Sequence, residues 1–313
     1  MIFRRRLLHT VFLLLLPLIV AWFGLSIWSA LLLVLAALLW RWLLAASSLL
    51  APERQPDIVL ETITASHFAE KVRWSMDRLG IDYTERPSAG ILGVLFAGRT
   101  VPRLNIKTGR ARSSIGHSPE ILRFLWGQYA ATLGERASFL APTPERLELE
   151  KTLDRYGVDL QVWVYSHLLQ ERDVVIHLWG ANDPRVPWWQ RAAIRPLFPL
   201  SRLFLQRVFA LSDEHHAKAV RHIDELLADI DTRVADGRKS ILGGDQSNYV
   251  DITFAALSGL WLQPENYAGG VARASRVARN RLPGPMQADI ERWIEDHPRA
   301  TAFITRMYAS ERK

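Results

Sequence analysis

The sequence predicts an α/β domain followed by an all-helical domain, with a transmembrane helical hairpin in front of them. Three observations support this prediction. The stretch Leu7–Trp40 contains no Asp, Glu, Lys or Arg. Between residues 58 and 126, short strand-like runs alternate with apolar positions at helical spacing, and from residue 145 onward the spacing is almost purely helical. A length of 313 residues is enough for about two domains.

The composition excludes several classes of function. The chain has no cysteine, which rules out disulfides, thiolate metal sites and a cysteine nucleophile. Its nine histidines show no metal-ligand spacing, so no metal site is predicted. The formal net charge is +7, but no basic and aromatic ladder accompanies it. We therefore expect no nucleic-acid partner and interpret the excess charge as lying beside a membrane.

Residues 1–50 are predicted to be a membrane anchor. At ~1.5 Å per residue, the uncharged stretch is too long for one ~30 Å span and fits two short helices, Leu7–Phe23 and Ile27–Leu44. Basic residues on both flanks favour both ends inside, so the protein would be integral to the membrane with its soluble domains facing the cytoplasm. A single uncleaved signal anchor is the alternative. Residues 51–57, which include two prolines, form a linker.

The α/β domain is predicted over residues 58–130. A strand at Ile58–Leu60 precedes a helix at Phe68–Leu79, whose apolar residues fall on one face while its charged residues face solvent. Ser66 then lies at the strand-to-helix turn, as the N-cap or next to it. The free N–H groups and the dipole of this helix favour an anionic or thiolate group there.

The rest of this domain is predicted from turn and cap signals. The helix after the last strand has Ser118 as N-cap and Pro119 at its first position, and ends near Gly127. The resulting βαβ-then-ββα order is that of a thioredoxin-like domain. The other expected elements are a strand at 81–83, a short helix at 91–96, and strands at 101–106 and 113–115 joined by a turn at 107–110.

The all-helical domain is predicted over residues 143–313. Asn248 and Asp251 form the acidic version of a capping box at the start of an apolar helix. The segment Trp188–Phe209 alternates aromatic residues with arginines, so it either packs within the domain or lies on an anionic membrane surface. The expected helices are one or two over 145–172, an amphipathic helix at 214–234, the capped helix at 252–262, and 290–308 broken at residue 298.

Three motifs in this order resemble the glutathione S-transferase superfamily: S-H-F-A-E-K-V-R at 66–73, Val101-Pro102 and His117-Ser118. The resemblance is detailed over residues 58–126 and looser from there to the C-terminus. It implies a glutathione-binding thioredoxin-like domain and an all-helical domain with a capped helix at its core.

The resemblance implies that Ser66 is the catalytic residue. Its hydroxyl would donate a hydrogen bond to the glutathione thiolate and lower a thiol pKa that is otherwise ~8.5. The alternative is that Ser66 only caps its helix, a role worth ~1 kcal/mol, and we expect both roles together only if the ligand displaces the cap. His67 is either an added positive charge when protonated or simply an exposed side chain.

The other two motifs imply contacts with the rest of the peptide. The Val101–Pro102 bond is expected to be cis, which leaves the main chain of Val101 free to pair with the cysteinyl backbone. Ser118 would receive the γ-glutamyl carboxylate at a helix N-terminus. His117, beside it, stands where the family usually has an acid, which leaves the partner of the glutamyl amino group open.

The sequence thus favours a membrane-anchored glutathione S-transferase-like protein that binds glutathione and conjugates it to an apolar electrophile. Glutathione is a substrate here, and no cofactor is expected. Tyr156, Trp163 and Tyr165 either wall the second-substrate site or are core residues. Whether the protein is an enzyme stays open, because a non-catalytic binding or scaffold protein would keep the same fold. Membrane lipid is an expected partner, a homodimer is left open, and a lipid-handling role through Trp188–Phe209 is a third interpretation.

Overall fold

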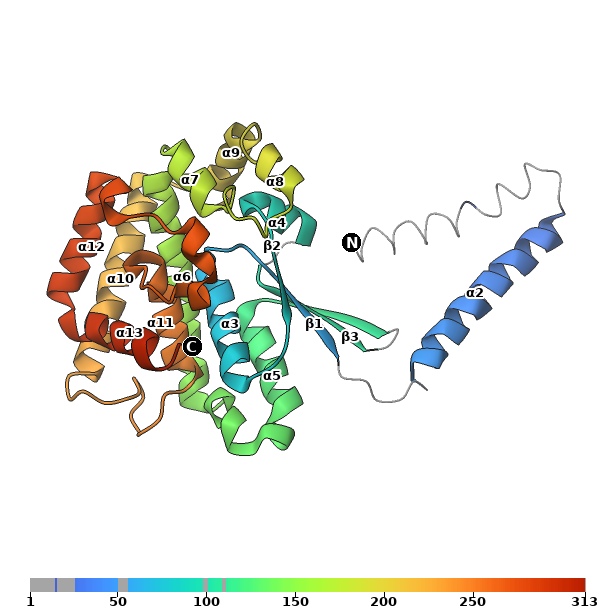
Figure 1. The fold of residues 1–313 in the computed structure, drawn as a ribbon, viewed down its shortest axis with the longest axis horizontal. Coiled ribbons are helices and arrows are strands. Elements are labelled where there is room, and N and C mark those ends of the chain that lie inside the picture. The colour runs from blue at the N-terminus through green and yellow to red at the C-terminus, as the bar shows by residue number, and fades with distance from the viewer. Residues whose placement is uncertain (1–14, 16–25, 50–55, 98–100, 109–110, 313) are drawn as a thin grey trace. The chain divides into compact units, whose positions relative to one another are not determined.

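The computed structural model describes residues 15, 26–49, 56–97, 101–108 and 111–312 (Figure 1). The chain divides into two compact units. One comprises residues 1–59 and 105–114, and the other comprises residues 60–104 and 115–313. The cavity and the polar clusters discussed below all belong to the second unit.

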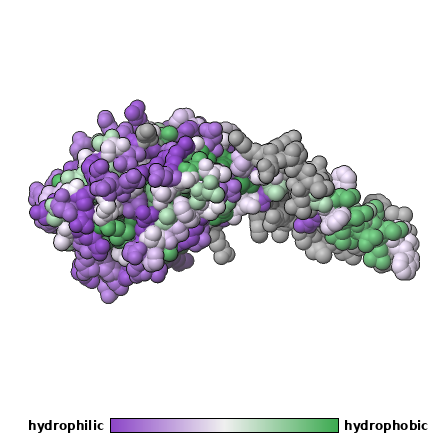
Figure 2. Space-filling view, turned by 90° about the horizontal axis from the view of Figure 1, so that it is seen from below, coloured by the Kyte–Doolittle hydropathy of each residue, from purple (hydrophilic) through white to green (hydrophobic). Residues whose placement is uncertain are grey.

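The described part of the structure does not support the predicted transmembrane hairpin. Its first arm, Leu7–Phe23, lies outside the described residues apart from Leu15. Its second arm falls in helix α2 (Ile27–Leu49), most of which forms hydrophobic surface in Figure 2. Among the helices that the structure describes, none has the length and apolarity to cross a bilayer.

The α/β part has a four-stranded sheet with the strand order β2-β1-β3-β4. Together with helices α3 and α5 it gives the predicted thioredoxin-like arrangement, although the second strand begins three residues later than expected and α5 continues past Gly127. The bounds are β1 (Asp57–Thr62), α3 (His67–Leu79), β2 (Thr84–Pro87), α4 (Gly90–Ala97), β3 (Arg103–Thr108), β4 (Ala111–Gly116) and α5 (Ser118–Leu133).

From residue 134 onward, the described chain is helical, as predicted. The expected 145–172 stretch is one long helix that ends at Leu168, and the next helix begins at Arg172. The elements are η1 (Gly134–Leu140), α6 (Pro144–Leu168), α7 (Arg172–Leu178), α8 (Trp188–Ala193), α9 (Phe198–Val208), α10 (Asp213–Arg233), α11 (Tyr249–Leu262), η2 (Tyr267–Ser275), η3 (Arg279–Arg281), α12 (Gly284–Asp296) and α13 (Pro298–Ser310). The predicted bounds of the two domains, 58–130 and 143–313, stay a prediction.

Helix α11 is the centre of the helical part and packs against α3, α6 and α13. Its start has the predicted capping box. Asn248 Oδ1 accepts a hydrogen bond from the Val250 N–H at 3.0 Å, and Asp251 Oδ2 accepts one from the Asn248 N–H at 2.7 Å. Asp251 Oδ1 also accepts from the Ile241 N–H at 2.7 Å, which fastens the preceding loop to the helix.

Three of the five charged residues of α3 are not on the surface, whereas the sequence predicted that all five face solvent. Glu70, Lys71 and Arg73 are buried, because α5, α11 and η2 pack against this helix on several sides. Helix α6 also approaches closely. A Cβ added to Gly157 of α6 would stand 2.6 Å from the Phe68 ring. Helix α3 is therefore an internal helix of the second unit.

The segment Trp188–Phe209 is partly packed. Phe198 and Leu205 are buried, which agrees with the interpretation that it belongs to the helical domain. Trp188, Leu200 and Val208 are exposed, so one side of the segment faces outward.

Candidate functional site

A cavity of about 740 Å³ lies where the first turns of α3 and α5 come together with α4, α6 and α9. Its lining includes all the predicted catalytic and ligand-binding residues. They come from three stretches of sequence that are well separated along the chain. The residues are Ser66, Val101, Pro102, His117 and Ser118.

Ser66 is the N-cap of α3, as one of its two predicted roles requires. Its backbone is extended, and its Oγ accepts a hydrogen bond from the Ala69 N–H at 3.2 Å. A hydroxyl that accepts one bond still has its own hydrogen to donate to a second partner. The cap and a donor bond to a ligand can therefore coexist, without the displacement that the sequence analysis expected.

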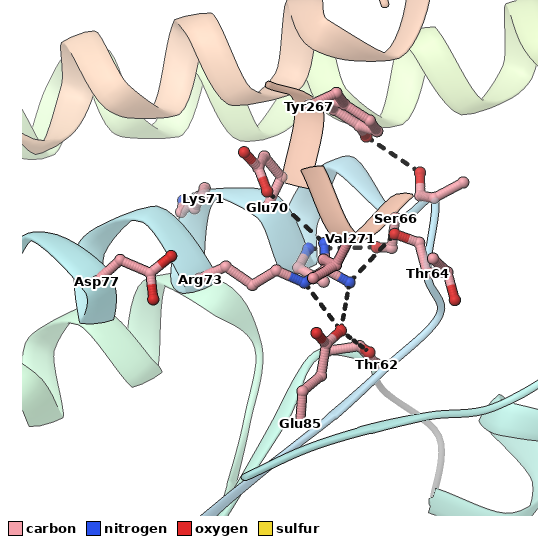
Figure 3. A network of polar contacts seen from close by, with 12 residues as sticks. Thr62, Thr64, Ser66, Glu70, Lys71, Arg73, Asp77, Glu85, Tyr267 and Val271 are labelled. Carbon is pink, nitrogen blue, oxygen red and sulfur yellow. Dashed lines mark hydrogen bonds and ion pairs between the residues drawn. The ribbon is translucent and has the colours of Figure 1, made fainter. Parts of the chain in front are cut away.

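The turn that presents Ser66 is held by a buried polar network (Figure 3). Arg73 donates from one guanidinium nitrogen to the main-chain oxygens of Ile63 at 3.3 Å and Thr64 at 3.1 Å. The Tyr267 hydroxyl donates to the main-chain oxygen of Ala65 at 3.1 Å. These bonds fix three consecutive residues directly before Ser66, and each comes from a side chain beyond the turn itself.

The same network anchors Arg73 in turn. Glu85 accepts hydrogen bonds from two of its nitrogens, at 2.9 and 2.7 Å. Thr64 Oγ1 also donates to Asp183 at 2.9 Å. Sequence reasoning missed these positioning residues, because it assigned Arg73 to a solvated helix face.

The Val101–Pro102 peptide bond is cis, as expected. At the start of α5, the structure differs by one residue from the prediction. His117 is the N-cap, with φ of 63° and no capping side-chain bond, and Ser118 is the first residue of the helix. Ser118 is 3% exposed, and His117 is exposed. The side chain of His117 is thus not used to build the helix start.

His67 is neither a positive charge in the cavity nor an exposed side chain, which corrects both of its predicted roles. It is buried, and its Nε2 lies 3.0 Å from the main-chain oxygen of Gly157. A carbonyl oxygen can only accept, so Nε2 carries the hydrogen. Burial lowers the pKa of His67 to about 4, which leaves the imidazole neutral near pH 7.

Acidic and basic side chains meet at the end of the cavity near α5. Glu120, Arg123 and Asp154 line it. Arg123 pairs with Glu120 at 3.1 Å, and buried Lys71 pairs with Asp154 at 3.1 Å. Glu150 lies behind them and pairs with both bases, at 3.1 and 3.4 Å. Two carboxylates, those of Glu120 and Asp154, therefore line the same cavity as His117.

The rest of the lining is mainly apolar and comes from α4, α6, α7 and α9. Of the three aromatic residues considered for this wall, only Tyr165 lines the cavity. Tyr156 is a core residue whose hydroxyl lies 2.9 Å from Ser258 Oγ, and Trp163 is buried and donates to Asp289 at 2.8 Å. Helix α9 adds Phe204 and Leu205, so the second half of the Trp188–Phe209 segment walls the cavity.

The fold is a thioredoxin-like α/β arrangement joined to an all-helical part, with the cavity at the two helix N-termini. No protein-family model matches the chain, and no curated protein does. Among solved structures, the chain is similar to a glutathione S-transferase from Methylobacterium radiotolerans in complex with glutathione sulfonate. That match has 17% identity and a TM-score of 0.48, and it covers 81% of this chain and 91% of that one.

Two other solved structures show a similar overlap. A glutathione transferase family member from Pseudomonas fluorescens with two glutathione bound has 15% identity and a TM-score of 0.44, covering 80% of this chain and 88% of that one. A glutathione S-transferase from Methylobacillus flagellatus with bound glutathione has 13% identity and a TM-score of 0.44, covering 80% and 95%.

Proposed function

We propose that the cavity binds glutathione and that Ser66 stabilises its thiolate for transfer to an apolar electrophile. The observation that supports this most is the convergence of three different functional groups on one cavity. These are the hydroxyl of Ser66, the main chain of Val101 and the helix start at Ser118. Each suits a different part of a small acidic peptide with a thiol.

At the sulfur end, the Ser66 hydroxyl donates its remaining hydrogen to the thiolate. The unpaired N–H groups and the dipole of α3 add a partial positive charge at the same place. Both effects lower the pKa of a thiol from its usual ~8.5, so more of it is ionised near pH 7. The thiolate then forms a carbon–sulfur bond with the electrophile, whose leaving group departs with the bonding electron pair.

At the glutamyl end, the carboxylate takes the free N–H groups at the start of α5, where Ser118 also offers its hydroxyl. The ammonium group pairs with a cavity carboxylate, Glu120 or Asp154, in place of the acid that His117 replaces. The main chain of Val101 pairs with the cysteinyl backbone. The apolar walls from α6 and α9 take the second substrate.

Calorimetric titration of the full-length protein with glutathione tests binding, and a series of serine variants tests the roles. Ser66→Ala should raise the pKa of the bound thiol, followed by the ultraviolet absorbance of the thiolate, and slow conjugation in an electrophile panel. Ser118→Ala should weaken glutathione binding by about 2- to 10-fold, the loss of one ordinary hydrogen bond. Ser66→Ala should leave affinity for the peptide backbone nearly unchanged.

Ser212→Ala is the matched control. Ser212 caps α10 and accepts from the His215 N–H at 3.1 Å, so the variant loses the same kind of cap as Ser66→Ala, away from the cavity. It should leave thiol pKa and conjugation unchanged. Absence of saturable binding at millimolar glutathione would contradict the whole proposal.

The exposed His117 favours a second candidate, a non-catalytic binding or scaffold protein. It offers no carboxylate at the glutamyl end, where tight positioning is needed for catalysis. Saturable glutathione binding with an unshifted thiol pKa and no conjugation would support this candidate over the enzyme.

A further inference from the structure

Three helices of the second unit bring two histidines and an aspartate together, away from the residues that line the cavity. They are His167 of α6, His216 of α10 and Asp289 of α12, and within the described part of the chain they are close enough to hold a metal ion. One ligand atom from each lies within 4.8 Å of the other two. His167 Nε2 is 3.3 Å from Asp289 Oδ2, and the two imidazole rings lie edge to face with centroids 4.8 Å apart.

His216 leaves a buried nitrogen without a partner. Its Nε2 is shielded from solvent and makes no hydrogen bond to any residue that the structure describes. A buried polar atom in that state costs about 1–3 kcal/mol unless something satisfies it. The side chain is half-buried, and rotation of its ring breaks no hydrogen bond at Nε2 to the residues that the structure describes.

The carboxylate of Asp289 accepts hydrogen bonds from residues that are not themselves candidate metal ligands, as metal-binding carboxylates usually do. Trp163 Nε1 donates to its Oδ2 at 2.8 Å, and Arg292 approaches its Oδ1 at 3.4 Å. Such outer contacts orient a ligand and tune the site. Arg292 is neutralised in turn by Asp224 at 2.7 Å, and Asp213 adds further negative charge near His216. The surroundings therefore favour a cation.

We propose that His167, His216 and Asp289 form a binding site for a divalent transition-metal ion of the zinc type. Two imidazoles and one carboxylate suit zinc and exclude magnesium and calcium, which prefer oxygen ligands. Ligands around a tetrahedral zinc stand about 3.3 Å apart, the present separation of His167 Nε2 and Asp289 Oδ2. Three protein ligands leave a fourth position for water or another small donor. The site is independent of the proposed glutathione function.

Titration of chelator-treated full-length protein with zinc against a chromophoric chelator tests the proposal. One equivalent should bind, and magnesium should not compete. His216→Gln should weaken zinc binding by more than the roughly 10- to 100-fold that loss of an outer contact costs. This variant should fold normally, because the nitrogen it removes has no partner among the described residues. Asp289→Asn should act in the same direction.

His215→Ala is the matched control, since it removes the neighbouring imidazole, which lies 3.3 Å from the Ala210 main-chain oxygen and outside the cluster. Zinc affinity should not change in it, nor in Ser66→Ala. Cobalt should give a visible absorption band in the wild type that is lost in His216→Gln. Absence of one-equivalent zinc binding in the wild type, or its retention at full affinity in His216→Gln, would overturn the proposal.

Discussion

Helices α3 and α11 pack against each other and are both buried, but by opposite means. Helix α11 is apolar on all sides, and Asp251 at its start is its one charged residue. Helix α3 buries Glu70, Lys71 and Arg73 among its apolar residues. The stability of α11 therefore comes from buried apolar area, whereas that of α3 depends on every charge finding its partner.

The partners of α3 come from distant parts of the chain. Glu70 pairs with Arg312 at 2.8 Å, and Lys71 pairs with Asp154 of α6 at 3.1 Å. Arg73, which pairs with Glu85 of β2, also holds the turn before Ser66 (Figure 3). In α3, the same residues thus contribute to stability and to the geometry of the candidate site. In α11, the residues that contribute to stability do not position the candidate site.

The strongest test of this difference is removal of one partner of a buried α3 charge. Arg312→Leu leaves Glu70 buried with a weakened set of partners, so we expect the free energy of unfolding to fall by about 3–5 kcal/mol in urea denaturation. Adding Glu70→Gln should recover part of the loss, because the unpaired charge is then gone. Arg299→Leu is the control. That arginine is 60% exposed and lies 3.7 Å from Asp231, so its loss should cost less than ~1 kcal/mol.

The next test measures how the stability that His67, the first residue of α3, contributes depends on pH. The pKa of His67 is lowered by burial to about 4, below its ordinary value of 6.5, so its contribution to stability is complete above pH 6.5 and is lost as pH falls through 4. The difference between the two pKa values corresponds to a loss of about 3 kcal/mol in the free energy of unfolding at low pH. Urea denaturation should show that the free energy of unfolding falls less between pH 7 and pH 4 in His67→Gln than in the wild type. Equal losses in the two proteins would argue against a buried neutral imidazole.

The smallest expected effect is at the start of α11. Asp251→Ala leaves the N–H groups of Ile241 and Asn248 without their acceptor, which should lower the free energy of unfolding by about 1–3 kcal/mol. Thermal unfolding of the variant measures it. A loss equal to that of Arg312→Leu would remove the contrast between the two helices.

The elements that depend on neighbours in sequence were predictable. Ser66 as a helix cap and the Asn248–Asp251 capping box follow from local hydrogen-bonding rules, and the structure has both. The burial of α3 was not predictable in the same way. An apolar stripe implies one covered face, but it does not reveal that distant acids and arginines cover the charged face as well.

The residues of the candidate site also differ in whether the sequence could predict them. The predicted residues Ser66, Val101 and Ser118 line one cavity, because each lies at the end of an element that the pattern located. The cavity carboxylate Asp154 and the cluster of His167, His216 and Asp289 could not be found by spacing, since their members lie on separate helices. Only the packing of those helices brings them together.

The bond between Glu70 and Arg312 spans 242 positions of the chain. At synthesis rates of 5–20 residues per second, the acid leaves the ribosome roughly 12 to 50 s before its base. Throughout that interval this carboxylate lacks Arg312 and has only the longer 3.7 Å contact with Arg73 of the same helix. The 2.8 Å ion pair of Glu70 therefore forms only after α13 and Arg312 have been made.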